Sequence, residues 1–260
     1  MVFRSNTYMK LGWFLLTALA AWGQGPVFEV ASVKPSQSLR EGSSIRNELG
    51  RFETVNTPLA KLIQYALPAQ DFQVVGGPGW IRDARFDITA SFGHSDSDVT
   101  TQPERIARIR ARLRHLLEDR FQLQLREEQR EMPVYGLEVE KGGVRMKAAA
   151  PIGNVNMNGG AAGSTLSGKG MTMPRLADIL SGIAGRPVND ETGLDGAYDL
   201  ELTYSREVAA PDAGAPAKDP LMAYPTLFAA LKEQLGLRLT GKKGTAPVWV
   251  VVRAEKPGEN

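Results

Sequence analysis

Apolar residues recur with helical spacing in two distant stretches of the chain. The stretches lie 117 residues apart and share the spacing i, i+3, i+4, i+7: Leu59, Leu62, Ile63 and Ala66, then Leu176, Ile179, Leu180 and Ile183. This period predicts two amphipathic helices, each with one buried stripe. Pro58 and Pro174 stand near the start of these stretches, where proline fits the first helical turn.

Strict alternation of apolar and polar residues predicts two half-buried strands, at residues 86–92 and 198–204. Two further blocks repeat with a shift of 114 residues: residues 117–125 match 231–239, and residues 133–139 match 247–253. Residues 248–252 are apolar on both faces, which predicts a strand in the centre of a sheet.

Four blocks therefore recur in the same order, with offsets of 117, 112, 114 and 114 residues. This period indicates two copies of a helix–strand–strand–helix–strand unit, each preceded by a strand or hairpin. Chance similarity between amphipathic elements is the alternative. The predicted fold class is α/β (α+β), with two tandem β-α-β-β-α-β-like units whose helices pack on small mixed sheets. The units are residues 24–147 and 166–260, a Gly/Ala/Asn-rich linker joins them at 148–165, and residues 207–224 form a loop in the second unit.

The first 23 residues have the organisation of a signal peptide. Arg4 and Lys10 precede an apolar run over residues 11–22, and the small residues Ala21 and Gly23 mark a cleavage site. We expect cleavage near Gly23 and an exported protein, located in the periplasm or outside the cell. A retained membrane anchor is the alternative, although a membrane span needs roughly 20 apolar residues and this run is shorter.

Short motifs follow one another along the chain: residues 28–35 (FEVASVKP), 76–80 (GGPGW), 85–88 (RFDI), 116–121 (LLEDRF), 192–199 (TGLDGAYD) and 234–237 (QLGL). With these motifs and the ending at 255–260, the chain resembles a soil-associated family of uncharacterised exported bacterial proteins. That resemblance implies a domain of unknown function and no mechanism. In pattern alone, the second unit is also similar to the short N-terminal domain of secretins and TonB-dependent receptors.

Composition excludes several kinds of site. The chain has no Cys and only His94 and His115, which excludes a cysteine nucleophile, a cysteine-ligated metal and an imidazole-rich metal centre. Removal of residues 1–23 takes away two basic residues and no acidic one, so the formal net charge falls from +2 to 0. A neutral chain has no global electrostatic attraction to nucleic acid. We expect no cofactor, no nucleic-acid partner, and membrane contact only through the signal peptide during export.

Three motifs suggest chemistry that other features oppose. Residues 163–170 (GSTLSGKG) nearly match a phosphate-binding loop, but Gly170 stands where the magnesium-binding hydroxyl belongs, so we predict the end of a linker. Asp87 and Asp199 occupy equivalent positions and suggest paired carboxylates; the alternation of their strands favours solvated or turn-bonding roles instead. A calcium site is the third possibility, although the spacing of its four acids fits no known loop: Asp190, Glu191, Asp195 and Asp199.

A helix predicted over residues 104–121 carries a core stripe and several arginines. Such a basic amphipathic helix could contact anionic lipid, a polyanionic polymer or an acidic partner. The alternative, which we favour, is a solvated arginine-rich face balanced by the acidic residues that follow it.

Two classes of function stay open. The leading class is a non-catalytic binding or interaction module of the cell envelope, with an unknown envelope protein or polymer as partner. The other class is a carboxylate- or metal-dependent hydrolase. Because no nucleophile–base set occurs, we assign no catalytic residue and no metal ligand. Sheet edges and two turn-rich loops are the candidate contacts, and the loop residues are Gly77, Pro78, Trp80, Thr192, Gly193, Asp195 and Gly196.

Overall fold

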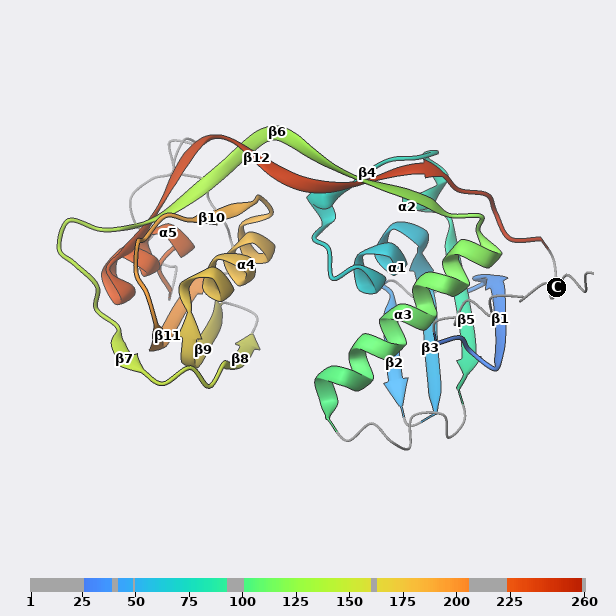
Figure 1. The fold of residues 1–260 in the computed structure, drawn as a ribbon, viewed down its shortest axis with the longest axis horizontal. Coiled ribbons are helices and arrows are strands. Elements are labelled where there is room, and N and C mark those ends of the chain that lie inside the picture. Colours follow the sequence, from blue (N-terminus) through green and yellow to red (C-terminus); the bar gives the residue numbers. More distant parts are fainter. Residues whose placement is uncertain are drawn as a thin grey trace, which may run out of the picture.

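The computed structural model describes residues 26–38, 42–48, 50–92, 101–159, 163–205 and 224–258. These residues form two lobes, each with its own hydrophobic core, and two long strands run from one lobe to the other (Figure 1). We call the lobe built mainly from the first half of the chain the N-lobe and the other the C-lobe.

The N-lobe contains a four-stranded antiparallel sheet, sheet A, in the order β1-β5-β3-β2. Its strands are β1 (Val30–Pro35), β2 (Ser44–Glu48), β3 (Arg51–Pro58) and β5 (Arg85–Ser91). Its helices are α1 (Leu59–Ala66), the single turn η1 (Asp71–Gln73), α2 (Trp80–Asp83) and α3 (Gln102–Arg120). Leu59, Ile63 and Leu117 are fully buried between these helices and the sheet, so the predicted apolar stripes form the core.

The C-lobe contains a second antiparallel sheet, sheet C, in the order β7-β11-β9-β8. Its strands are β7 (Lys147–Ala149), β8 (Asn154–Gly159), β9 (Gly163–Thr172) and β11 (Ala197–Ser205). Its helices are α4 (Met173–Ala184), α5 (Leu227–Ala230) and the π-helical turn η3 (Leu231–Leu235). Buried residues of α4 and η3 pack on the sheet through Leu176, Leu180 and Leu231.

Local sequence explains where the main helices begin and end. Thr101 precedes α3, and its hydroxyl accepts a hydrogen bond from the backbone N–H of Glu104 at 3.4 Å, which caps the helix. Proline stands in the first turn of both α3 and α4, where no N–H is needed. Gly185 ends α4 with a φ of 64°, a left-handed conformation that glycine adopts without strain.

The strands β6 (Gln124–Val139) and β12 (Leu237–Arg253) pair antiparallel along nearly their whole length and bridge the lobes (Figure 1). Two short strands complete this third sheet, sheet B, in the order β10-β6-β12-β4: β4 (Val74–Gly76) and β10 (Val188–Asp190). β12 lies between β6 and β4, so the prediction of a central strand at residues 248–252 is confirmed.

Each lobe receives half of a strand that begins in the other lobe. β4 of the N-lobe pairs in parallel with the end of β12, where Val74 faces Trp249. β10 of the C-lobe pairs in parallel with the end of β6, where Val188 faces Tyr135. Val188 lies 114 residues after Val74, and Tyr135 lies 114 residues before Trp249, so the two pairs correspond. Accordingly, Leu137 of β6 is buried in the C-lobe core.

The α/β fold class is confirmed, and several predicted elements form as expected. The two helices with matching apolar spacing form as α1 and α4, the helix predicted over residues 104–121 forms as α3, and both alternating strands form as β5 and β11. Sheets A and C have the same order when their strands are matched as β1 with β7, β5 with β11, β3 with β9, and β2 with β8. These correspondences are those that a duplication would produce. The duplication of the units itself stays a prediction.

The predicted linker at 148–165 is wrong as a description of local structure. These residues contribute to β7, β8 and the start of β9, and residues 163–170 lie in β9 and not at a linker end. The segment is poor in large apolar residues because β8 lies at the margin of sheet C, where little of it is buried. The predicted signal peptide and the predicted loop at 207–224, apart from Tyr224, lie outside the described residues.

Candidate functional site

In the first predicted contact loop, Gly77 and Pro78 are exposed, and Trp80 packs against the N-lobe core. Gly77 has a φ of 75°, and a Cβ added there would lie 2.9 Å from the side chain of Val251. Trp80 is half-buried, and its ring meets Phe86 edge to face with the centroids 6.2 Å apart. Packing therefore explains why glycine and an aromatic residue occur here.

The second predicted loop lies between β10 and β11 and is held by its own polar groups. The carboxylate of Asp190 accepts hydrogen bonds from the backbone N–H and the hydroxyl of Thr192, at 3.0 and 2.7 Å. Gly193 and Gly196 have φ values of 63° and 91°, and the Asp195 side chain is exposed. Leu194 of this loop packs on the C-lobe core, whereas Trp80 packs on the N-lobe core, so the two loops are anchored separately.

Asp87 and Asp199 have turn-bonding roles. Asp87 accepts a hydrogen bond of 2.8 Å from the backbone N–H of Asn56, and Asp199 accepts one of 2.9 Å from the backbone N–H of Gly170. Asn56 and Gly170 both have positive φ values, 54° and 58°, and each lies next to a shift in strand register. Each carboxylate thus stabilises a β-bulge in the neighbouring strand.

Other chemical candidates find no support among the described residues. No group of three or more His, Asp or Glu side chains could hold a metal ion there. His115 is exposed on α3, and His94 lies outside the described residues. A shallow hollow of about 330 Å³ near the end of α3 is lined mostly by polar residues and charged residues of both signs: Asp119, Arg120, Gln122, Glu255, Lys256, Pro257 and Gly258. Within the described part of the chain, every helix is too short or too polar to cross a membrane.

The arginines of α3 have intramolecular partners. Arg112 is buried, lies over the Phe92 ring at 4.6 Å from its centroid, and donates to the carbonyl of Val27 at 3.2 Å. Arg110 lies over the Tyr65 ring at 5.7 Å, and Arg114 pairs with Glu118. These contacts favour packing and local pairing over an anion-binding face.

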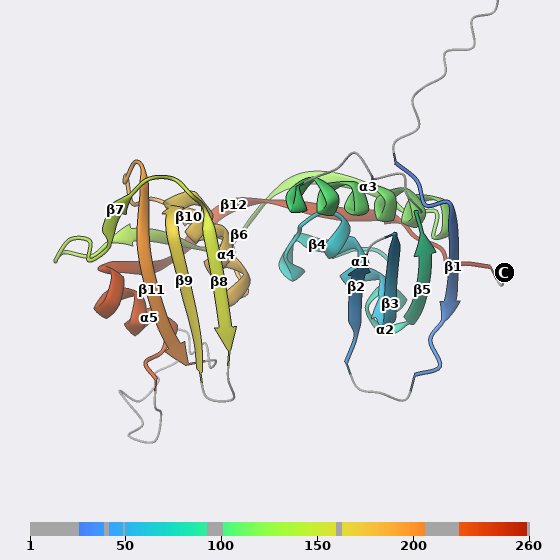
Figure 2. The same cartoon turned by 90° about the horizontal axis from the view of Figure 1, so that it is seen from below.

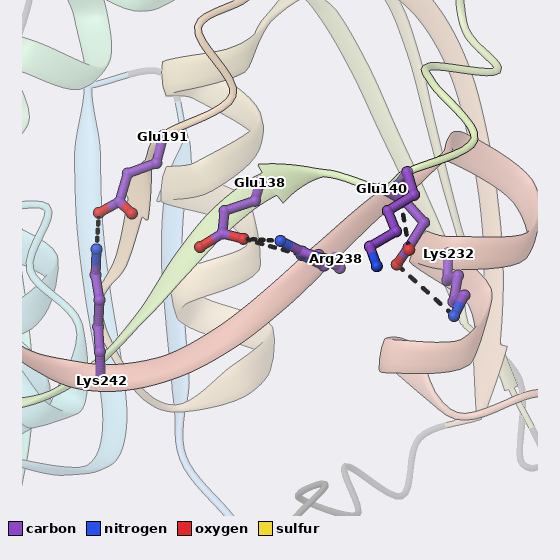
Figure 3. Close-up of polar contacts among 7 residues, drawn as sticks. Glu138, Glu140, Glu191, Lys232, Arg238 and Lys242 are labelled. Atoms are coloured by element: carbon purple, nitrogen blue, oxygen red, sulfur yellow. Dashed lines mark hydrogen bonds and ion pairs between the residues drawn. The ribbon is translucent and has the colours of Figure 1, made fainter.

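Charged side chains link three strands of sheet B within the C-lobe (Figure 3). Arg238 faces Glu138 across β6 and β12 and forms an ion pair of 2.6 Å with it. Glu191, just after β10, pairs with Lys242 of β12. Its carboxylate lies over Gly136, where an added Cβ would come within 2.7 Å of an oxygen. Each of these two carboxylates is paired with a base on β12, so the cluster links the crossing strands.

The cluster makes the stability of the C-lobe depend on pH. Hydrogen bonds from Arg238 hold the pKa of Glu138 below its usual range, and the backbone N–H of Lys141, with Lys232, lowers the pKa of Glu140. A carboxyl group whose pKa is lower in the folded protein contributes stability above its unfolded pKa of about 4.3. That contribution is lost as the pH falls through the folded pKa.

We therefore predict that Glu138→Gln lowers the melting temperature at pH 7 and leaves it unchanged at about pH 2. At low pH the wild-type carboxyl is protonated, so its ion pair with Arg238 is already lost. Thermal unfolding followed by circular dichroism at both pH values measures the effect. Equal losses at both pH values would contradict an ionic role for Glu138.

Within the described residues, the outer edge of β8 is exposed and pairs with no other strand. β8 is the last strand of sheet C, and all six of its residues are exposed. On one side β8 pairs with β9 from Asn154 to Gly159. In an antiparallel strand, half of the backbone N–H and C=O groups point to the other side. Figures 1 and 2 show that this free side of sheet C is the one nearest the N-lobe.

The side chains of β8 alternate between apolar and amide groups. Met157 pairs with the buried Leu166, and Val155 pairs with Gly168, so both extend the face of sheet C that carries the core. Met157 is nevertheless 53% exposed and Val155 36% exposed. The remaining side chains of the strand are asparagines on the other face, at positions 154, 156 and 158. β8 therefore presents an uncharged edge with an uncovered apolar margin.

The corresponding strand of sheet A, β2, is different. Ile45 pairs with Thr54, and Asn47 pairs with Phe52. Thr54 and Phe52 lie 114 residues before the β9 partners of Val155 and Met157. Ile45 and Asn47 therefore correspond to Val155 and Met157. The outer-face positions of β2 are Arg46 and Glu48, which are exposed. Charged residues on an edge strand oppose the addition of another strand. β2 therefore has a protected edge, and β8 does not.

A sequence signal for β8 was present but weak. Asn154, Val155, Asn156, Met157 and Asn158 alternate with period two, as a half-buried strand does. The flanking glycines and alanines give the same stretch the composition of a linker, and that composition outweighed the alternation in the prediction.

Comparison with known proteins identifies one family. The family model described as "Protein of unknown function (DUF3738)" matches residues 60–254, which include nearly all of α1, both long strands and the whole of sheet C. No curated protein and no solved structure matches the chain.

Proposed function

Because the chain belongs to the DUF3738 family of proteins of unknown function, we propose its role from geometry: a non-catalytic interaction module that holds an extended segment of a partner at the free edge of β8. Together with the predicted signal peptide, this proposal makes the protein an exported module of the cell envelope, in line with the resemblance to soil-associated exported proteins. The open, uncharged edge of β8 is the observation that carries it.

Strand addition fits this edge for two physical reasons. An extended segment that pairs with β8 would satisfy its outward backbone N–H and C=O groups, which supply affinity without regard to sequence. A side chain of the added segment opposite Met157 would continue the apolar row formed by Leu202, Leu166 and Met157 across sheet C. Burial of that row adds hydrophobic stabilisation of about 25 cal/mol per Å² of apolar surface.

The two predicted contact loops and the hydrolase alternative have less support. Trp80 and Gly77 are explained by packing, and the polar groups of the second loop bond within the loop. Contact through these loops stays a prediction. No arrangement of the described residues favours the hydrolase, since Asp87 and Asp199 are both bonded to backbone amides.

A labelled peptide tests the proposed edge. We predict that a fluorescent peptide with the sequence of residues 163–169, which pairs with β8 on its other side, raises its anisotropy on titration with the purified chain. Met157→Lys should abolish the rise, because a charge facing inward on an edge strand opposes pairing.

Asn47→Lys is the matched control, since Asn47 holds the corresponding position in β2. It should leave peptide binding unchanged. Binding that is absent in the wild type, or equal in wild type and Met157→Lys, would contradict the proposed edge. Circular dichroism of both variants checks that they are folded.

A further inference from the structure

The side chains around the free edge define the chemistry of its partner. We infer that β8 selects an uncharged extended segment with apolar side chains at every second position, supplied by another protein. This inference rests on the proposed function, because it names the partner for the same edge.

The apolar positions of the partner follow from the pairing in sheet C. Leu202, Leu166 and Met157 form one row on the core-facing side, and Leu200, Gly168 and Val155 form the next. A segment added to β8 places side chains opposite Met157 and Val155, two residues apart and on the same face. Apolar side chains there would cover the 53% of Met157 that is exposed. Charged side chains at these positions would be desolvated against Met157 with no partner.

The polar positions of the partner are also set by β8. Asn154, Asn156 and Asn158 lie on the opposite face, and none of the six residues of β8 is charged. The strand behind β8 continues this face with Thr165 and Ser167, and with the exposed Lys169 opposite Asn154. The surface next to the edge therefore consists of amides and hydroxyls, with one cation at the start of β8. Short side chains that both donate and accept hydrogen bonds, such as those of Thr, Ser and Asn, match this surface. A partner with regular acidic or basic residues would meet no residue of opposite charge on β8 itself.

A single exposed strand also limits the form of the partner. An extended segment reaches both the backbone groups and the apolar margin of β8, since its side chains alternate with the same period of two. A helix has no unsatisfied backbone groups along its length and would leave those of β8 unpaired. The inferred partner segment is therefore in the β conformation when bound.

Three synthetic peptides of equal length test the inference against the wild-type chain. The first alternates Thr and Val, the second has the same composition with all Val residues in one block, and the third alternates Thr and Lys; each has the same soluble flanks. We expect the alternating Thr-Val peptide to bind at least tenfold more tightly than either of the others. Competition against the labelled 163–169 peptide gives the relative affinities.

Two further measurements make the result specific to β8. Met157→Lys should remove the advantage of the Thr-Val peptide, whereas Asn47→Lys in β2 should keep it. Infrared spectra of the bound Thr-Val peptide with a ¹³C-labelled backbone should show the amide band of a β-strand. An advantage that persists in Met157→Lys would overturn the inference, because the selecting surface would then lie elsewhere.

The outcomes separate the inference from the proposed function. If the 163–169 peptide binds in a Met157-dependent way while the three designed peptides bind equally, the edge is real and the inferred selectivity is wrong. If the Thr-Lys peptide binds best, the partner is a basic segment and the inference is again wrong. If no peptide binds, both the proposed function and the inference fail.

Discussion

Gly170→Ala is expected to destabilise the protein by roughly 3 kcal/mol or more, the range of substitutions that strain a special backbone position. Gly170 has a φ of 58°, which alanine adopts only with strain. An added Cβ would also collide with the carbonyl oxygen of Ala150 and the backbone nitrogen of Ile152. The chain at 150–152 leads into β8, so we expect the substitution to disorder the edge as well. Urea unfolding followed by circular dichroism measures the loss of stability.

Gly185→Ala is the matched control for this prediction. Gly185 has a similar φ of 64°, but an added Cβ there meets nothing within 4 Å. Its substitution should cost about 1 kcal/mol, which is the price of the left-handed conformation alone. Equal effects at both positions would show that the close approach of Ala150 to Gly170 has no energetic importance.

Leu137→Ala is expected to destabilise the protein by about 2–5 kcal/mol, as for other buried leucines. Leu137 lies in β6, a strand that begins in the N-lobe, but it is fully buried in the C-lobe core. The cavity should therefore weaken the C-lobe first. Amide hydrogen exchange should rise around Leu166, Leu202 and Leu231 while the amides of the N-lobe core keep their protection.

Val252→Ala is a control on the same sheet, because Val252 is 57% exposed and its truncation leaves no cavity. It should change stability by less than about 0.5 kcal/mol. If Leu137→Ala instead raised exchange around Phe52 and Leu117, the assignment of β6 to the C-lobe core would be wrong.

Local elements were predictable from the sequence because their signals are local. The period of Leu59, Leu62 and Ile63 is that of a helix with one buried face, and these residues are fully buried in α1. The alternation at residues 86–92 likewise predicted β5, in which every second residue is buried. The path of the long strands was not predictable, because no local pattern shows that residues 133–139 pack in a different lobe from residues 124–131.

The candidate site was harder to predict than the fold. Gly77 and Trp80 were predicted as contact residues, yet the backbone conformation of Gly77 and the core packing of Trp80 explain why these residue types occur there. β8 was not predicted as a strand, because a strand at the margin of a sheet buries little side-chain surface and so needs few apolar residues. The difference between β8 and β2 becomes visible only when both strands are placed at the edges of corresponding sheets.

The reciprocal contribution of β6 and β12 has a consequence for the order of folding. Val74 of β4 pairs with Trp249, so the N-lobe core lacks a strand until residues 247–253 have been synthesised. Contacts of such long sequence separation slow folding, because a large loop must close before the contacts form. During synthesis the first half of the chain therefore exposes apolar surface that only the last strand covers. We expect this half to depend on chaperones or on an extended state until the chain is complete.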